Sequence, residues 1–462
     1  MVFPIVGGTQ STGYEIDNSL RYNNPDDPSL AITFGSAGNR KTFTISAWIK
    51  RGNIADNRTI FGQGTASNPR GLFFLADQQL RMTNTNDGTT NDMDVQTSAV
   101  LRDASAWYHV VAAVDVTQGT DTNRVKLYIN GELQTSFANA TYPAQNTDLN
   151  WNNTVLHAVG RYPASDAHHW DGYISEFYFI DGTQYAASDF GETDDNGVWI
   201  PKAASVTFGT NGFKLEFQQT GTGTASASTI GADTSGNTNH LTSTNLAATD
   251  ITTDSPTNNF MTGNPLAIIN GSEAPTRIPD YSEGNTVATA SNGTTRYLLG
   301  TFATSMPYYF EVKVLSTSST DSSQRIGIVD AEAISNATTY NVAYQADGVI
   351  TATGESNATG KQSITANDII GVAVDLATNN NVKLYHNGTL QATMSVGSSY
   401  QSLLTTPFAR LVDATQSFSF NFGNPSFAIS SGNADANGYG NFEYAVPSGY
   451  YALCTKNLAE YG

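Results

Sequence analysis

The residues of this sequence that could do chemistry are few, and the carboxylates are poorly grouped. Retaining cleavage of a glycosidic bond uses two carboxylates, and a strand of the form Glu-x-Asp-x-x-Glu places such groups on one face. The nearest match, Glu15-Ile-Asp17, lacks the second glutamate, and Glu176 stands alone beside Ser175. The sequence therefore does not favour hydrolysis at a carboxylate pair.

The histidines also lack the spacing of a metal site or a catalytic site. None of the six forms a His-x-x-x-His or Glu-x-x-His pattern, and there is no Gly-x-Ser-x-Gly elbow or phosphate-binding loop. The single cysteine, Cys454, excludes an internal disulfide framework and a multi-cysteine zinc site. We expect a protein that is not an enzyme and has no cofactor, with calcium as the one ion to consider.

An acidic loop offers oxygen atoms of the kind that calcium binds, several of them close together. The candidate ligands are Asn84, Asn86, Asp87, Asp92 and Asp94. The loop does not match the twelve-residue calcium-binding pattern, and strings of Asn, Asp and Gly are also ordinary turn sequence. A calcium site is one interpretation, and a plain turn is the favoured alternative.

The segment between residues 162 and 171 is the better candidate for binding a ligand. Sugar recognition combines an aromatic face for the apolar side of the ring with polar groups for the hydroxyls. The segment supplies both kinds of group, and the candidate residues are Tyr162, Asp166, His168, His169, Trp170 and Asp171. The alternative is that Trp170 opens a strand and packs on the edge of the protein core, which is common for an aromatic residue at a strand start.

The first residues form an apolar segment ahead of the first strand. Its apolar side chains are Val2, Phe3, Ile5 and Val6, while Pro4 and the glycines that follow discourage a helix. An extended apolar peptide can add itself to the edge of a neighbouring sheet. We expect residues 1–13 to be an arm that docks the protein on a partner, the alternative being that the arm seals its own domain.

Strands and turns must position all of these groups, and one hairpin pattern occurs twice. Residues 113–135 and 373–392 each contain an apolar strand ending on Asp, a polar loop, the sequence Val-Lys-Leu-Tyr, an Asn-Gly corner and a return strand beginning Leu-Gln. Asn-Gly suits a tight hairpin because both residues tolerate positive φ. In another predicted strand, residues 43–50, apolar and other side chains alternate, which puts Phe43, Ile45, Ala47 and Ile49 on one face.

The composition agrees with an all-β protein and excludes some partners. The chain has 462 residues, of which 39% are hydrophobic and only 14% charged, with a formal net charge of −19. An acidic protein of this kind is not expected to bind nucleic acid. No apolar run is long enough to span a bilayer, and the first residues lack the basic start of a signal peptide. We therefore expect no membrane insertion.

Family resemblance enters through four blocks in the first part of the chain. Phe43-Thr-Ile-Ser-Ala-Trp, Trp107-Tyr-His-Val-Val, Val125-Lys-Leu-Tyr-Ile-Asn-Gly and Trp170-Asp-Gly-Tyr-Ile-Ser resemble, in that order, the laminin-G-like or concanavalin-A-like jelly roll. In the second part, strands such as Tyr308-Tyr-Phe-Glu-Val-Lys and Ser417-Phe-Ser-Phe-Asn-Phe resemble the SPRY sandwich. The resemblance implies an all-β fold of two antiparallel β-sandwich domains of jelly-roll type, joined by an irregular connector.

These observations predict five segments. They are an N-terminal arm (1–13), a laminin-G-like jelly roll (14–205), a connector with one or more strands (206–274), a SPRY-like sandwich (275–427) and a C-terminal tail packed on the second domain (428–462).

The tail and the Pro-Thr-Asn-Asn-Phe connector resemble those of structural proteins of marine tailed bacteriophages. This resemblance implies a non-enzymatic virion protein of a tail fibre, appendage or surface decoration, made in the cytoplasm of an infected host. Its expected partners are other virion proteins, further copies of itself in a homo-oligomer, and a host cell-surface polysaccharide. The alternatives are a free carbohydrate-binding module and a glycan hydrolase on a jelly-roll scaffold.

Overall fold

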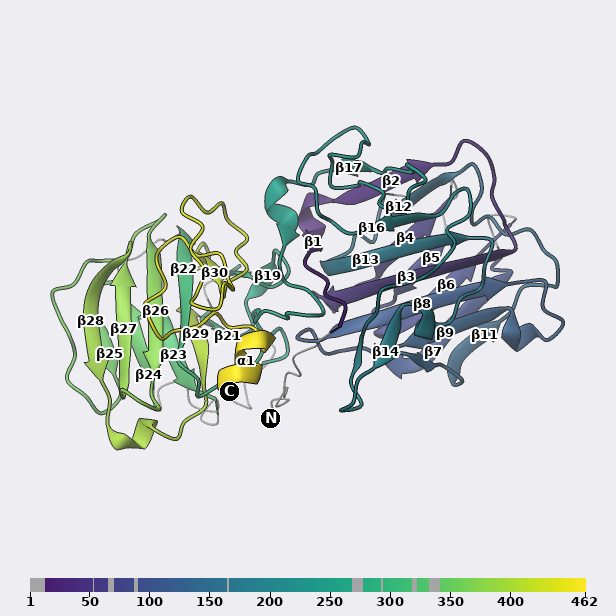
Figure 1. The fold of residues 1–462 in the computed structure, drawn as a ribbon. Coiled ribbons are helices and arrows are strands. Elements are labelled where there is room, and N and C mark those ends of the chain that lie inside the picture. Colours follow the sequence, from purple (N-terminus) through teal and green to yellow (C-terminus); the bar gives the residue numbers. More distant parts are fainter. Residues whose placement is uncertain are drawn as a thin grey trace. The chain divides into compact units, whose positions relative to one another are not determined.

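Two compact units make up the chain. The computed structural model describes residues 13–52, 54–64, 70–86, 90–163, 166–267, 277–291, 294–317, 322–331 and 341–462. Among the described residues, we call 13–257 the first unit and 258–462 the second unit. Strands dominate both units, which confirms the predicted all-β fold of antiparallel sandwiches (Figure 1). Among the residues described, no helix is long and apolar enough to cross a membrane.

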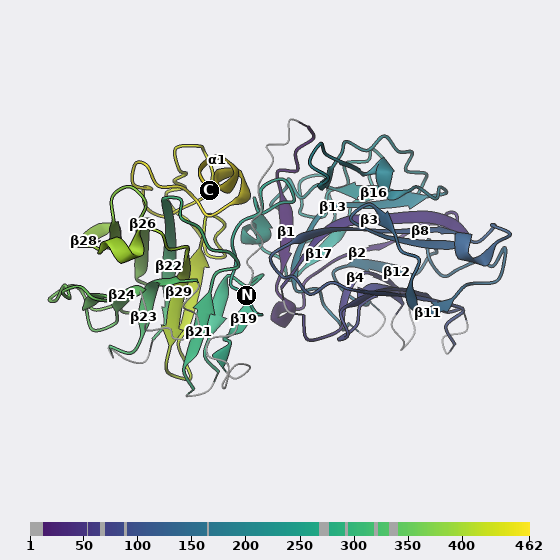
Figure 2. The same cartoon turned by 90° about the horizontal axis from the view of Figure 1, so that it is seen from below.

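The first unit consists of two layered sheets of eight strands each (Figure 2). One sheet has the order β10-β9-β8-β3-β13-β1-β18, and β16 also pairs with β13. Its strands are β1 (Ser19–Tyr22), β3 (Thr42–Arg51), β8 (Trp107–Asp115), β9 (Val125–Ile129), β10 (Glu132–Leu133), β13 (Gly172–Asp181), β16 (Phe213–Leu215) and β18 (Ile251–Thr252).

The other sheet of this unit has the order β11-β7-β6-β5-β4-β12-β2-β17. Its strands are β2 (Ser29–Thr33), β4 (Arg58–Gln63), β5 (Gly71–Phe74), β6 (Gln79–Asn84), β7 (Met93–Val100), β11 (Phe137–Thr141), β12 (Leu156–Val159) and β17 (Thr242–Thr244). A separate pair joins β14 (Gly191–Thr193) to β15 (Trp199–Pro201). Short 3-10 turns complete the unit: η1 (Asn24–Asp26), η2 (Asp121–Asn123), η3 (Ala187–Asp189) and η4 (Ala248–Asp250).

The core of the first unit lies between its two sheets, as the alternation of β3 predicts. Phe43, Ile45, Ala47 and Ile49 are all buried in this core. Trp48, on the opposite face of the same strand, joins a separate outer cluster with Trp107 and Tyr173. The two-residue period of the strand therefore sorts its side chains between the core and the outer face.

The predicted connector differs from the observed structure, because residues up to 257 complete the first unit. Strands β16, β17 and β18 pair with β13, β2 and β1, respectively. Asp254 then fixes the end of the unit: its carboxylate accepts bonds from Lys50 Nζ at 2.8 Å and Trp107 Nε1 at 3.1 Å. The polar segment around Asp233 also belongs to the first unit, since the carboxylate of Asp233 accepts a hydrogen bond from the backbone N–H of Lys214 at 3.0 Å.

The second unit is another sandwich, of seven and five strands. The larger sheet runs β19-β20-β30-β22-β26-β27-β28 and contains β19 (Asp280–Ser282), β20 (Val287–Thr289), β22 (Tyr308–Ser316), β26 (Ile369–Asp375), β27 (Asn381–His386), β28 (Thr389–Ser395) and β30 (Ser417–Asn421). The smaller sheet runs β21-β29-β23-β24-β25 and contains β21 (Arg296–Leu299), β23 (Arg325–Asp330), β24 (Asn341–Gln345), β25 (Ile350–Ala352) and β29 (Thr405–Leu411). The helical segments whose bounds the structure describes in this unit are η6 (Ser398–Tyr400) and α1 (Thr455–Tyr461).

Both repeated hairpins form as the Asn-Gly corners predict. Asn130 and Gly131 have φ of 47° and 83° between β9 and β10, and Asn387 and Gly388 have φ of 46° and 76° between β27 and β28. Positive φ at both corner residues matches the right-handed twist of the strands on either side. The repeat therefore marks equivalent hairpins in the two units.

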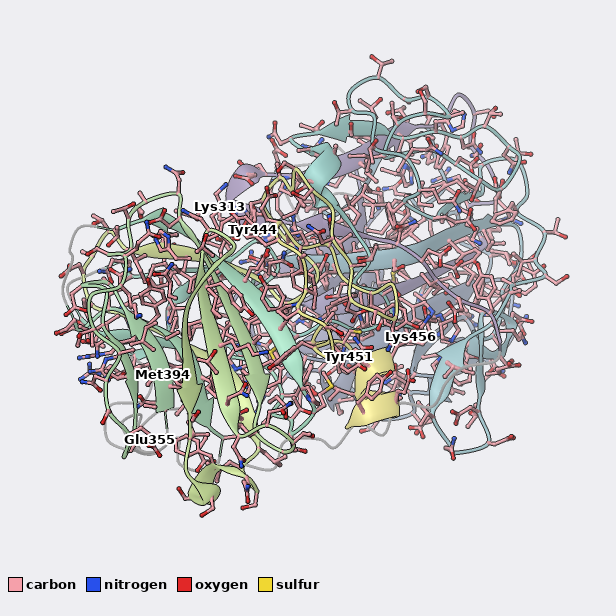
Figure 3. All side chains as sticks on the ribbon, turned by 60° about the vertical axis from the view of Figure 1, so that its left-hand side comes forward. Lys313, Glu355, Met394, Tyr444, Tyr451 and Lys456 are labelled. Atoms are coloured by element: carbon pink, nitrogen blue, oxygen red, sulfur yellow. The ribbon has the colours of Figure 1, made fainter. Side chains whose placement is uncertain are left out.

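The tail after residue 428 covers the outer face of the larger sheet in the second unit. Glu311, fully buried on β22, accepts bonds from the backbone N–H groups of Glu443 at 2.9 Å and Tyr444 at 2.8 Å. Phe442, Tyr450 and other tail residues pack on this face in one hydrophobic cluster. Figure 3 labels Tyr444 and Tyr451 of the tail, and Lys456, which lies in α1.

Candidate functional site

The two aromatic residues of the predicted sugar site are buried. Trp170 belongs to the core of the first unit, where its ring lies 6.1 Å from that of Phe74. Tyr162 is only 1% exposed and forms an isolated bridge with Ala167. Neither residue is sufficiently exposed for its ring to stack on a sugar. This arrangement agrees with the alternative, in which Trp170 is a core residue.

The polar residues of the same segment behave differently, because two of them lie at the surface. Asp166 is exposed and His168 is half-buried, and both have left-handed backbones with φ of 49° and 55°. Non-glycine residues rarely adopt this conformation, and such strain often accompanies functional loops. The carbonyl oxygen of His168 accepts a bond from the backbone N–H of Thr59 at 2.9 Å. The loop is therefore attached to β4.

The β1–β2 loop lies beside the β12–β13 loop, which contains Asp166 and His168, because both loops connect the two sheets at neighbouring strands. The β1–β2 loop and the β12–β13 loop lie together since β1 pairs with β13 and β2 pairs with β12. His169 Nε2 lies 3.5 Å from Asp27 Oδ1 and 3.5 Å from Asp166 Oδ1. Arg161 binds the carboxylate of Asp166. We call Asp27, Arg161, Asp166 and His169 the Asp27–Asp166 cluster.

The hydrogen-bonding capacity of His169 is only half used. Its ring is 3% exposed, and Nδ1 lies 3.3 Å from the carbonyl oxygen of Pro28. Within the described part of the chain, Nε2 makes no hydrogen bond, and its two close neighbours are carboxylate oxygens, which accept hydrogen bonds. The two carboxylates therefore present several acceptor atoms together and suit a ligand that donates hydrogen bonds.

His168 and Asp171, which also belong to the predicted site, have different environments. The pKa of His168 is lowered, by burial and then by the nearby Arg58 guanidinium. His168 is thus held neutral beside the cluster. Asp171 is buried, and its carbonyl oxygen accepts a bond from the backbone N–H of Gly52 at 2.9 Å. Asp171 consequently fixes the start of β13 rather than the exposed part of the loop.

The candidate calcium loop uses its oxygen atoms within the protein. Asp94 forms a two-pronged pair with Arg81, and Asp92 accepts a bond from Asn84 Nδ2 at 2.7 Å. The same amide group donates to Asn86 Oδ1 at 3.1 Å, and Asp87 lies outside the described residues. In the part of the chain that the structure covers, no three His, Cys, Asp or Glu side chains are grouped to hold a metal ion. Calcium binding remains a prediction without geometric support.

A cluster on the outer face of β13 has no signal in the sequence. Glu176 has a left-handed backbone, φ 42°, at a bulge between Ser175 and Tyr178. Its carboxylate accepts bonds from the hydroxyls of Tyr14 and Tyr178 and lies 3.0 Å from Lys214 Nζ. The cluster is found only in three dimensions, since it joins residues from distant parts of the chain.

The chemistry of this cluster is that of an ion-pair network. Lys214 Nζ lies 2.6 Å from Glu216 Oε1 as well as near Glu176. Although burial acts to lower it, the pKa of Lys214 is raised by Glu176, Tyr178 and Glu216. Lys214 therefore pairs with both carboxylates. The cluster instead fixes Tyr14, next to the predicted arm, whose residues Val2, Phe3, Ile5 and Val6 lie outside the described part.

Comparison with known proteins identifies both units. Residues 25–188 match the family described as the concanavalin A-like lectin/glucanases superfamily, and residues 307–425 match the SPRY domain family. No curated protein matches the chain.

Three similar solved structures cover parts of the chain. A putative carbohydrate binding protein from Bacteroides ovatus is 16% identical, with 52% of this chain and 60% of that chain covered and a TM-score of 0.36. A SAP-like pentraxin from Limulus polyphemus is 16% identical over 37% of this chain and 80% of its own, with a TM-score of 0.28. The SPRY domain of human HERC1 is 14% identical over 29% and 87%, with a TM-score of 0.25. From the family matches, the chain combines a concanavalin A-like domain with a SPRY domain.

Proposed function

We propose that this chain is a non-enzymatic structural protein of a tailed-phage virion that contacts a host surface glycan through the Asp27–Asp166 cluster. The virion carries it on a tail fibre, an appendage or a surface decoration, after synthesis in the host cytoplasm. The order of the two matched families along the chain supports this assignment. The Pro-Thr-Asn-Asn-Phe sequence and the tail, which resemble those of phage structural proteins, also support it.

One observation carries the glycan contact: two exposed carboxylates, those of Asp27 and Asp166, converge beside the buried ring of His169. His169 Nε2 lies 3.5 Å from the carboxylates of both Asp27 and Asp166, and each carboxylate is largely exposed. Sugar hydroxyls donate hydrogen bonds, so vicinal hydroxyls satisfy such acceptors directly. The Arg161 guanidinium holds Asp166 in place, which reduces the ordering cost of binding.

The two alternatives have less support. A glycan hydrolase needs a protonated acid near a second carboxylate, and the pair found in the first unit, Glu176 and Glu216, shares the charged Lys214. A free carbohydrate-binding module does not account for the resemblance of the second unit and its tail to virion proteins. Cleavage of a glycan substrate, measured by release of reducing ends, would favour the glycan hydrolase alternative.

The glycan contact is tested by binding of the full chain to an array of bacterial surface polysaccharides. Asp166→Asn should weaken binding with little change in melting temperature, because Asp166 is exposed and asparagine also tolerates the left-handed backbone at this position. Asp195→Asn is the matched control, since that aspartate is also exposed and lies in another loop. Equal binding by the Asp166 variant and the parent protein would contradict the assignment of this site.

The virion assignment is tested by labelling intact particles with gold-coupled antibodies against the full chain. Labelling at a fixed position on the tail or capsid is the expected result. Particles that carry no label, with the protein recovered only in the free fraction, would instead favour the carbohydrate-binding module. Light scattering of the purified protein checks the expected homo-oligomer.

A further inference from the structure

Strand β28 forms one edge of the larger sheet in the second unit. Within the described residues it pairs only with β27, so its other side presents backbone N–H and C=O groups to no partner strand. β28 has seven residues, whereas the other edge strands of the two sandwiches have two to five. A long exposed edge is a template for pairing with a further strand.

The sequence of β28 lacks most of the features that protect an edge. It reads Thr-Leu-Gln-Ala-Thr-Met-Ser, without a charged residue or a proline, which are common means of preventing contact between edges. Leu390 on this strand is 49% exposed, the highest value for a large hydrophobic side chain in the part of the chain that the structure describes. A bulge at Gln391 is the one protective feature, and it leaves Ala392 to Ser395 in regular pairing with β27.

The equivalent hairpin of the first unit has a protected edge. Its return strand, β10, is also an edge strand, but it has only two residues, and one of them is Glu132. Both return strands follow the same Asn-Gly corner, so the difference lies in the residues that come after that corner. The chain therefore blocks the edge in one hairpin and leaves it open in the other.

The geometry of β28 suits pairing with a second copy of itself. An antiparallel pair about a twofold axis makes a strand edge complementary to itself, since the N–H groups of each strand meet the C=O groups of the other. Ala392 and Met394 pack against the core of the second unit, and Thr393, between them, is exposed. With the axis at Thr393, Ala392 lies opposite Met394 of the second copy, and the two Thr393 side chains lie opposite each other.

The charge of the chain favours contact between copies at this edge. With a formal net charge of −19, two copies repel one another over most of their surface. β28 has no acidic residue, and the residue opposite Thr393 on β27 is Lys383. Two acidic copies can therefore approach here with little repulsion.

We propose that β28 is a homodimer interface, at which two copies of this chain pair antiparallel about a twofold axis and join their larger sheets into one continuous sheet. A standard interface uses about 20–30 residues from each partner, and β28 supplies seven. The free protein should therefore dimerise only at micromolar or higher concentrations. The proposal rests on the proposed function only in the expected homo-oligomer, and not in the glycan contact.

Sedimentation velocity of the full chain across micromolar concentrations measures the dimer. Thr393→Lys should weaken dimerisation at least about tenfold, because it places two ammonium groups opposite each other across the axis. Thr141→Lys is the matched control, since Thr141 is an exposed threonine at the end of β11, an edge strand of the first unit. Both threonines are exposed, so neither variant should change the melting temperature. Added salt should strengthen the dimer of the parent protein, because salt screens the repulsion between acidic copies.

A cysteine at the axis tests the geometry directly. Cα atoms of opposed residues in an antiparallel pair are about 4.5–5.5 Å apart, which a disulfide can span, so mild oxidation should link two copies of Thr393→Cys. Cys454, the single native cysteine, is buried, so the parent protein should not be linked. Thr141→Cys measures linking by random collision. Equal linking of the two variants, equal effects of the two lysine substitutions, or a monomer at every concentration would overturn the proposal.

Other occupants of the edge give different results. Deleting residues 2–8 should leave the dimer unchanged; loss of the dimer and of the Thr393→Cys disulfide would assign the edge to the N-terminal arm and overturn self-pairing. A dimer that persists in Thr393→Lys would keep the expected homo-oligomer but place its interface elsewhere. Thr393→Lys should retain glycan binding, so a glycan contact that fails in Asp166→Asn alone leaves the β28 dimer supported.

Discussion

Removing the carboxylate of Asp254 should severely destabilise the first unit. Lys50 and Asp254 are 1% and 0% exposed, and their charged atoms lie 2.8 Å apart. Truncating one partner of a buried pair typically costs about 3–5 kcal/mol, because the other charge stays buried without compensation. Asp254→Ala also takes the acceptor from Trp107 Nε1 at 3.1 Å. The expected loss is a large fraction of the total stability of a domain of this kind.

Tryptophan fluorescence during urea unfolding measures this loss in the first unit alone. All five tryptophans lie before residue 258, so the signal excludes the second unit. Asp148→Ala is the control, because Asp148 pairs with Lys41 at 3.6 Å on an exposed surface, where such pairs contribute less than about 1 kcal/mol. Equal losses in the two variants, or a loss below about 1 kcal/mol in Asp254→Ala, would refute the reasoning.

The pH dependence of Asp254→Asn gives a second check on the same pair. Burial lowers the pKa of Lys50 in the folded protein, and Asp254 opposes that shift. Without the carboxylate of Asp254, the pKa of Lys50 in the folded protein falls further, while the pKa of Lys50 in the unfolded chain keeps its ordinary value. Between those two values the unfolded state binds more protons, so stability rises with pH. The difference in free energy of unfolding between Asp254→Asn and the parent protein should therefore become smaller from neutral pH toward pH 10. A difference that stays constant with pH would indicate lost packing alone.

Three further variants test other parts of the structure. Gly388→Ala should destabilise the second unit by about 2 kcal/mol or more in calorimetry, since an added Cβ would lie 2.5 Å from the ring of Tyr444 at positive φ. Tyr14→Phe removes the hydroxyl bound to Glu176 and should cost about 1–2 kcal/mol by tryptophan fluorescence. Deleting residues 2–8 should leave melting unchanged but abolish incorporation into particles; lowered melting with normal incorporation would show that the arm only completes its own domain.

Sequence patterns predicted the parts of the fold that depend on neighbours in the chain. The alternation of β3 placed Ile45 in the core and Trp48 outside, because a strand's side chains alternate between its faces. The Asn-Gly corners predicted both hairpins from two residues each. The predicted connector was expected to hold one or more strands, but β17 and β18 were not located, since two or three residues carry no periodicity and their partners lie far away in the sequence.

The candidate site was predicted only in part, for a related reason. Asp166 and His169 were chosen for their residue types, and the structure brings them together. Asp27 was missed because it reaches the site through the pairing of β1 with β13 and of β2 with β12. Trp170 has the sequence environment of a sugar-binding residue, but packing against Phe74 buries it, and no local pattern distinguishes the two outcomes.

The repeated hairpin has the same packing role in both units. In the first, a Cβ added at Gly131 would lie 2.4 Å from the ring of Trp199, which comes from β15 later in the chain. In the second, Gly388 meets Tyr444 from the tail in the same way. Each corner glycine therefore satisfies two requirements, a positive φ and room for an aromatic ring. Because a later segment supplies that ring in each unit, the hairpin is a docking point for the segment that closes the domain.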